Sequence, residues 1–256
     1  MTSEAQFQWT SASCSHAGLV RLNNEDACLD KPEQGIWAVA DGMGGHAFGE
    51  LASSRLIEAL NATGPPASLG QFAAEVRNRL QHVNQQLRTE AQMRDVPVIG
   101  STVAVLLAHE RRCCCLWAGD SRIYLYRDSA LKLLTRDHSQ IEELKARGAF
   151  SLEEALLMLP RNIITRAVGA SDTLELDEET LDVGDGDMFL LCSDGLSNEV
   201  SEQEMQYILL TRNCRQASEA LVDLALDHGG RDNISAVVVR AEDLYSVEKT
   251  VLNPAL

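Results

Sequence analysis

The stretch from Ser101 to Thr135, STVAVLLAHERRCCCLWAGDSRIYLYRDSALKLLT, contains four apolar and aromatic segments that are separated by short polar turns. Segments of this length and composition predict β-strands. A parallel crossover needs about a dozen residues or more, so turns this short predict antiparallel neighbours. The stretch therefore indicates antiparallel sheet rather than the alternating βαβ units of a nucleotide-binding fold.

Three consecutive cysteines lie inside this stretch, and the chain holds seven in all. The odd number and the consecutive spacing suit neither a disulfide framework nor a zinc site. Reduced cysteine behaves as a small hydrophobe, so we expect Cys113 and Cys115 to point from a strand into the core.

The segments on either side of this stretch add strands and two pairs of helices. Apolar runs predict strands at 8–15, 26–30, 35–41, 188–193 and 233–243. Helical spacing of apolar residues predicts helices at 46–61, 69–93, 201–212 and 215–228. Strands in two blocks with paired helices predict an α+β fold of antiparallel sheets covered by helices. We expect one domain over residues 1–243 and a tail over 244–256.

The charge balance excludes several classes of partner. A net charge of -16 and a pI near 4.7 argue against binding to nucleic acid or to an anionic membrane surface. The sequence shows neither a signal peptide nor a run of about 20 apolar residues that could span a bilayer. We therefore expect a soluble, cytoplasmic protein.

Four aspartates stand at the ends of apolar segments: Asp41, Asp120, Asp194 and Asp232. Any one of them alone is typical of a turn or a helix cap. If the four converge, their carboxylates repel one another unless a cation holds them ionised. Oxygen ligands favour Mg²⁺ or Mn²⁺, and two such ions that share one carboxylate are a common device for attack on phosphorus.

A dinucleotide site is the alternative for the stretch VADGMGGHAFGE, because Gly42, Gly44 and Ala47 fit the pattern G-x-G-x-x-A. The flanking chain does not form a βαβ unit, and Asp41 would face the pyrophosphate. We therefore favour a metal site, in which the bare backbone of Gly42 lets its carbonyl approach an ion. Arg21, four residues before Glu25, supplies a guanidinium that can grip a phosphate.

Eight motifs in the same order make the chain resemble the metal-dependent PPM/PP2C-type Ser/Thr protein phosphatases, in particular the compact bacterial members. The resemblance covers residues from about 8 to 241. Its motifs are RLNNEDA, VADGMGGHAFGELAS, GSTVAVLL, WAGDSRIYLYR, LTRDHS, ITRAVG, DMFLLCSDGLSNEV and GGRDNISAVVV. The resemblance implies an α/β/β/α sandwich of two antiparallel sheets with a binuclear Mn²⁺ or Mg²⁺ site at one end.

The resemblance also implies a role for each residue of that site. Asp41 would bridge two tightly bound ions, and Asp194 and Asp232 would complete the first. The Gly42 carbonyl would bind the second ion, with Glu25 holding it through water.

Further roles follow from the same resemblance. Asp120, with Asp194, would bind a weaker third ion. Arg21 would bind the substrate phosphate, and Asn233 would support Asp232. The segment from Ser139 to Thr165 would form a flap beside the active site, where substrate preference is set.

The expected activity is hydrolysis of phosphoserine and phosphothreonine by direct attack of a metal-bridging hydroxide, without a phosphoenzyme. The expected partners are phosphorylated proteins and a cognate bacterial Ser/Thr kinase, with the enzyme acting as a monomer. Two alternatives remain: a pseudophosphatase that only binds phosphoproteins, and a regulatory phosphatase of an anti-sigma or anti-anti-sigma pathway.

The proton donor for the leaving oxygen is left open by the sequence. Eukaryotic members of the family usually carry histidine where this chain has Met43, which has no titratable proton. Either water donates the proton or the leaving group needs no donor. His46, three residues further on, is interpreted as a residue of helix start or packing.

Overall fold

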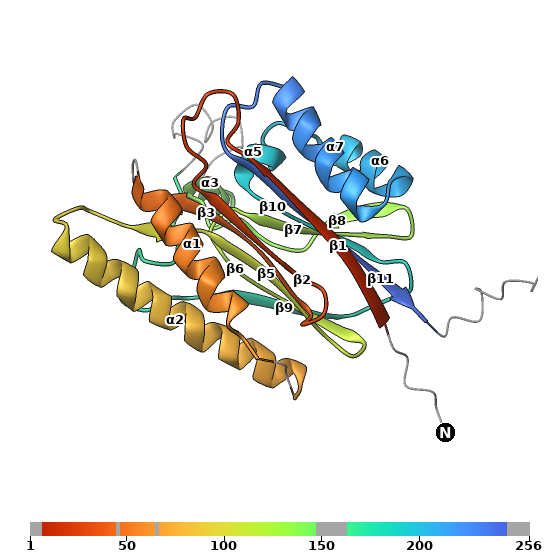
Figure 1. The fold of residues 1–256 in the computed structure, drawn as a ribbon, viewed down its shortest axis with the longest axis horizontal. Coiled ribbons are helices and arrows are strands. Elements are labelled where there is room, and N and C mark those ends of the chain that lie inside the picture. The colour runs from red at the N-terminus through yellow and green to blue at the C-terminus, as the bar shows by residue number, and fades with distance from the viewer. Residues whose placement is uncertain (1–6, 45–46, 65–66, 147–162, 245–256) are drawn as a thin grey trace, which may run out of the picture.

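Two antiparallel β-sheets packed face to face form the centre of the computed structural model, which describes residues 7–44, 47–64, 67–146 and 163–244 (Figure 1). The strands of the first sheet, in spatial order, are β1 (Phe7–His16), β11 (Ile234–Asp243), β10 (Met188–Cys192), β7 (Arg122–Arg127) and β8 (Ala130–Leu133). Those of the second are β2 (Asp26–Lys31), β3 (Ile36–Met43), β5 (Val103–His109), β6 (Arg112–Ala118) and β9 (Asp177–Asp182), with β4 (Gly100–Ser101) paired to β3.

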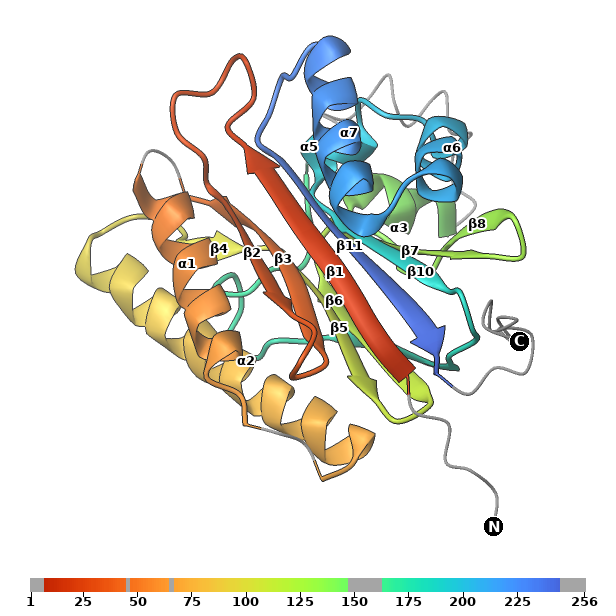
Figure 2. The ribbon, with the colours of Figure 1, turned by 45° about the vertical axis from the view of Figure 1, so that its right-hand side comes forward.

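A pair of helices covers the outer face of each sheet, on opposite sides of the molecule (Figures 1 and 2). Helices α1 (Ala47–Asn61) and α2 (Leu69–Met93) pack on the second sheet, and α6 (Glu202–Thr211) and α7 (Cys214–Asp227) on the first. Two shorter helices are α3 (Gln140–Ala146) and α5 (Asp194–Ser197). This arrangement confirms the α/β/β/α sandwich that the resemblance implies. No helix within the described ranges is long and apolar enough to cross a membrane.

Alternation along the strands builds the three layers of core. In β3, Ala38 and Ala40 face α1 and α2, whereas Trp37 and Val39 face the other sheet. Successive side chains of a strand point to opposite faces, so each central strand needs apolar residues at nearly every position.

The three consecutive cysteines follow the same alternation. Cys113 and Cys115 are buried between the sheets, as predicted. Cys114 is buried too, on the helix side, because β6 is covered on both faces. Continuous apolar runs of this kind mark strands that do not meet water on either side.

Element boundaries differ from the prediction in two places that matter for the site. The third strand does not end at Asp41 but continues to Met43, because Gly42 and Met43 pair with Ser101 and Gly100 of β4. The short helix α5, which begins at Asp194, was not predicted. Within the expected flap from Ser139 to Thr165, the structure describes α3, and residues 147–162 lie outside the described ranges.

Loops far apart in the sequence meet at one end of the sandwich. The β1–β2 loop, residues 17–25, lies beside the turn at 228–233 that leads into β11 (Figure 2). The backbone N–H of Leu19 donates to the Gly230 carbonyl at 2.7 Å. This junction brings the N-terminal motif with Arg21 next to the C-terminal motif with Asp232.

Candidate metal centre

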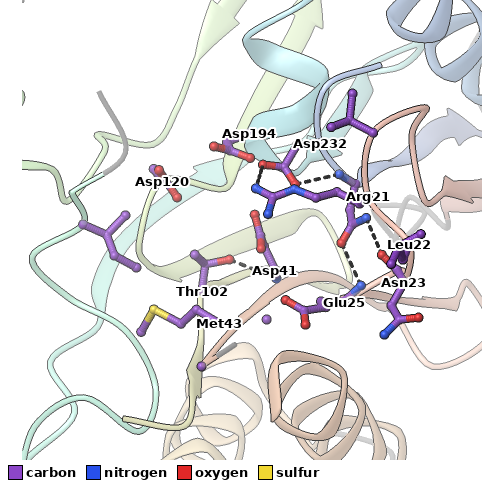
Figure 3. A pocket seen from close by; sticks show the side chains of 15 residues that line it. Arg21, Leu22, Asn23, Glu25, Asp41, Met43, Thr102, Asp120, Asp194 and Asp232 are labelled. Atoms are coloured by element: carbon purple, nitrogen blue, oxygen red, sulfur yellow. Dashed lines mark hydrogen bonds and ion pairs between the residues drawn. The ribbon is translucent and has the colours of Figure 1, made fainter. Parts of the chain in front are cut away.

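One hollow at this end of the sandwich is lined by all eight residues to which the sequence assigned a role at the metals or the phosphate (Figure 3). They are Arg21, Glu25, Asp41, Gly42, Asp120, Asp194, Asp232 and Asn233. Met43 and Thr102 also line it. His46 and residues 147–162 of the predicted flap lie outside the described part of the chain.

Asp41 is held at the end of β3 by its own backbone. Its N–H donates to Thr102 Oγ1 at 3.1 Å, and its carbonyl accepts from the Thr102 N–H at 2.8 Å. These hydrogen bonds do not involve the Asp41 carboxylate, which points into the hollow (Figure 3). Thr102 is a residue that the sequence analysis missed, although it lies in the motif GSTVAVLL.

Gly42 has no room for a side chain. A Cβ at this position would lie 2.0 Å from the Gly49 carbonyl oxygen of α1 and 2.7 Å from that of Glu25. The Gly42 N–H donates to the Glu25 carbonyl at 3.1 Å. The strand end, the first turns of α1 and the β1–β2 loop thus meet at a backbone without a Cβ.

Asp194 opens helix α5 directly after β10. Asn198, one turn on, donates to Asp194 Oδ2 at 3.2 Å and fixes the orientation of the carboxylate. The next residue, Gly195, lies so near the turn before β11 that a Cβ would be 1.9 Å from the Asn233 carbonyl oxygen. This close approach places Asp194 beside Asp232.

Asn233 connects the two ends of the chain. Its side-chain Nδ2 donates to the carbonyls of Ala17 and Asn23, both at 2.9 Å, and its Oδ1 accepts from the Glu25 N–H at 2.7 Å. Its backbone N–H donates to Asp232 Oδ1 at 2.9 Å. Asn233 therefore fixes the β1–β2 loop through its side-chain amide and the Asp232 carboxylate through its backbone N–H.

Arg21 reaches into the hollow from the β1–β2 loop and donates from Nη2 to Asp232 Oδ2 at 2.8 Å (Figure 3). The Asp232 carboxylate raises the pKa of the guanidinium above its usual value. The pair is partly exposed, so it contributes little to stability, on the order of 1 kcal/mol at most. Arg21 thus stands where an anion in the hollow would meet it.

Asp26 is a second residue that the sequence analysis missed. It lies opposite Asp41 in the β2–β3 register and is buried behind the hollow. Ser193 donates to Asp26 Oδ2 at 2.7 Å, whereas Oδ1 has no hydrogen-bond partner within the described chain. The sequence feature that could have identified Asp26 is the acidic pair that it forms with Glu25 in the motif NEDA.

The carboxylates of this end of the molecule have raised pKa values. Burial, and then the charges of neighbouring carboxylates, raises the pKa of Asp41 well above its usual range. The same causes raise the pKa values of Asp26 and Asp120 to about 7. The pKa of Asp194 is raised by burial and by Asp232, although a hydrogen bond to Asp41 opposes the shift.

These observations fit a divalent cation. Burial and the neighbouring carboxylates favour the protonated forms of Asp41 and Asp194, and a cation can take the place of these protons. Among the described residues that line the hollow, every charged side chain except Arg21 is a carboxylate, and oxygen donors select Mg²⁺ or Mn²⁺. Within the described ranges no three His, Cys, Asp or Glu side chains are grouped closely enough to hold a metal ion as they stand.

The raised pKa values predict an unusual stability profile without metal. In EDTA, the thermal midpoint is expected to rise as the pH is lowered from about 8 to about 5. The pKa values of Asp26 and Asp120 are 3.8 in the unfolded chain and about 7 in the folded chain. Between these values the folded chain binds more protons than the unfolded chain. Protonation therefore stabilises the fold, and this contribution is lost as the pH rises through about 7.

Circular dichroism melts in EDTA at several pH values measure this profile. Mn²⁺ is expected to raise the midpoint more at about pH 8, where it replaces no protons, than at about pH 5. Asp26→Asn is the matched variant, and its midpoint should depend less on pH. A metal-free midpoint that falls steadily from pH 8 to pH 5 would contradict the raised pKa values.

Comparison with known proteins identifies relatives over most of the chain. The family model described as "Protein phosphatase 2C" matches residues 12–227. The serine/threonine phosphatase stp of Listeria welshimeri is 35% identical over 232 residues, which are 87% of this chain and 92% of the relative.

Solved structures share the fold at similar coverage. PppA, described as a key regulatory component of T6SS in Pseudomonas aeruginosa, is 44% identical with a TM-score of 0.85, over 91% of this chain and 97% of that one. The catalytic domain of the serine/threonine protein phosphatase PstP, solved with two manganese ions, is 33% identical with a TM-score of 0.82. That match covers 93% of this chain and all of the PstP domain.

Proposed function

Because the chain belongs to the protein phosphatase 2C family and is a metal-dependent protein serine/threonine phosphatase, we propose that the hollow lined by its four aspartates is the active site. The observation that carries the proposal is the convergence of Asp41, Asp120, Asp194 and Asp232 with Arg21. The bound ions supply neutralisation of phosphate charge and activation of the attacking water.

We propose that two ions are held as the family resemblance implies. Asp41, Asp194 and Asp232 would hold the first, and Asp41 and the Gly42 carbonyl would hold the second, with Glu25 holding it through water. The PstP domain with two manganese ions supports Mn²⁺, with Mg²⁺ as the alternative, and a third, weaker ion is assigned to Asp120 with Asp194. Gly49 supports the use of the Gly42 carbonyl and Glu25 as donors, because a Cβ there would lie 2.8 Å from the Gly42 carbonyl oxygen and 2.5 Å from Glu25 Oε2.

The other residues of the hollow position the reaction. Thr102 fixes the backbone of Asp41, and Asn233 fixes the loop that carries Arg21 and Glu25. Arg21 changes partner from Asp232 to the substrate phosphate, which it can grip through two parallel hydrogen bonds. Met43 has no titratable proton, and no histidine lines the described part of the hollow. We therefore propose that water donates the proton to the leaving oxygen.

Phosphorylated proteins are the proposed substrates, and a cognate Ser/Thr kinase is the proposed opposing partner of a monomeric enzyme. The description of PppA as a regulatory component supports a regulatory role of the same kind. We also propose a cytoplasmic location, which is supported by the seven cysteines, since all of them are free thiols.

The test is hydrolysis of p-nitrophenyl phosphate and of a phosphothreonine peptide in Mn²⁺ and in EDTA. We expect turnover of both substrates with Mn²⁺ and none with EDTA, because the carboxylates alone repel a phosphate. Activity that persists in EDTA would contradict the metal mechanism. Equilibrium dialysis against Mn²⁺ measures the number of bound ions. Two ions are expected to bind at low Mn²⁺ concentration and a third at high concentration. Saturation at two ions would contradict the third-ion site but not the other two.

A further inference from the structure

Three large aliphatic side chains on the β1–β2 loop are exposed to solvent beside the phosphate-binding arginine. Leu19 is 67% exposed, Val20 66% and Leu22 99%. Val20 and Leu22 line the same hollow as Asp41 (Figure 3). Exposed apolar groups gathered at a binding hollow mark a contact surface, because covering them removes apolar area from water.

The loop that carries these side chains is fixed. Asn233 Nδ2 binds the carbonyls of Ala17 and Asn23, at the two ends of the exposed group. The Leu19 N–H donates to the Gly230 carbonyl at 2.7 Å. Gly18, with a φ of 79°, lies so close to Asp232 that a Cβ would be 2.2 Å from its carbonyl oxygen.

This anchoring has an energetic consequence. A loop that is already ordered loses little conformational entropy when a partner covers it. The exposed aliphatic groups are therefore presented in place rather than displayed by chance on a loose segment.

The chemistry of the surroundings defines what the surface can accept. Arg21, between Val20 and Leu22, is the one charged side chain from Leu19 to Asn24, and it serves the phosphate. Ile164, which also lines the hollow, adds another aliphatic group, and its β-bridge to Ser139 fixes the position of its backbone. The carboxylates lie inside the hollow. A phosphorylated residue at the centre would thus have an apolar surface next to it.

We propose that Leu19, Val20 and Leu22 form an apolar rim that binds an aliphatic side chain next to the phosphorylated residue of a protein substrate. Leu22, the most exposed of the three, determines this preference. The inference rests on the proposed function, since it assigns the sequence preference of the same active site. The rim adjoins the hollow, and this continuity identifies the substrate as its occupant.

The test compares two phosphothreonine peptides that differ only in the residues next to the phosphothreonine, leucine in one and serine in the other. The wild type is expected to favour the leucine peptide by about tenfold in kcat/KM, mainly through KM, from burial of part of a leucine side chain. Leu22→Ser should remove most of this preference. Its hydrolysis of p-nitrophenyl phosphate, which reaches no further than the phosphate pocket, should be unchanged.

The matched control is Leu210→Ser, because Leu210 is 58% exposed on α6 and does not line the hollow. This variant should keep the wild-type preference. Equal kcat/KM for both peptides in the wild type, or a preference that survives Leu22→Ser, would overturn the rim. Analytical ultracentrifugation could also contradict the proposal. If the wild type were a dimer and Leu22→Ser a monomer, the rim would bind a second copy of the chain rather than the substrate.

The experiments distinguish failure of the proposed function from failure of the apolar rim. If the wild type hydrolyses neither p-nitrophenyl phosphate nor either peptide in Mn²⁺, the proposed function fails. If it hydrolyses all three without a peptide preference, the function stands and the rim alone is wrong.

Discussion

Asp41→Asn is expected to lower kcat/KM for p-nitrophenyl phosphate by about 10³-fold, since loss of the proposed bridging carboxylate would remove several kcal/mol of transition-state stabilisation. The fold should survive, because the hydrogen bonds that hold Asp41 come from its backbone and Thr102. In EDTA the variant is expected to melt at the same temperature as the wild type or higher. Burial and the charges of Asp26 and Asp194 raise the pKa of Asp41, so the ionised carboxylate destabilises the metal-free fold.

This opposite response of activity and stability separates a metal ligand from a structural residue. Steady-state kinetics, calorimetric Mn²⁺ titration and thermal melts measure the three quantities. Asp223→Asn, on the exposed face of α7, makes the same change of charge away from the hollow and should leave all three unchanged. An Asp41→Asn protein with wild-type Mn²⁺ affinity and turnover would show that Asp41 is no ligand.

Gly42→Ala is expected to be nearly as damaging, for a steric reason. Its Cβ would lie 2.0 Å from the Gly49 carbonyl oxygen and 2.7 Å from that of Glu25, so α1 or the β1–β2 loop must move. Overpacking of this kind costs about 3 kcal/mol of unfolding free energy. A displacement of about 1 Å in a catalytic constellation lowers turnover by about a hundredfold. Denaturant melts and kinetics with Mn²⁺ measure the two effects.

The chain offers a matched control for this substitution. Gly70, near the start of α2, has no atom within 4 Å of the position where its Cβ would lie. Gly70→Ala is therefore expected to leave activity unchanged and to stabilise the helix by up to about 1 kcal/mol. A Gly42→Ala protein with wild-type stability and turnover would contradict the crowded geometry described for the end of β3.

Local patterns were enough to predict the regular elements. Helix α2 occupies the residues expected from the spacing of Phe72, Val76, Leu80 and Leu87, all of which are buried. Its start is set by Ser68, whose side chain accepts from the Gln71 N–H. The predicted end of β3 was two residues too early, because the true end depends on pairing with β4. Met43 pairs with Gly100, which lies 57 residues further along the chain. A pattern within one segment carries no information about such a partner.

The site was predictable only through ordered motifs, and only in part. Carboxylate chemistry identified the four aspartates, because each follows or precedes an apolar run. Asp26 escaped notice, since it is buried behind the hollow and its role depends on Ser193, 167 positions away. Asn233 was expected to support Asp232, and its backbone N–H donates to Asp232 Oδ1, but the three hydrogen bonds of its side chain to the β1–β2 loop were not predicted. Contacts of this range become visible only in three dimensions.

The anchoring of the β1–β2 loop by Asn233 has a consequence for biosynthesis. The hydrogen bond from Glu25 to Asn233 joins residues 208 positions apart, and β11 pairs with β1 along its whole length. A nascent chain emerges from its N-terminal end, so a ribosome-bound fragment that stops short of Asn233 can hold neither the loop nor the full set of carboxylates. We therefore expect phosphatase activity to appear only after β11 has been synthesised and has paired with β1.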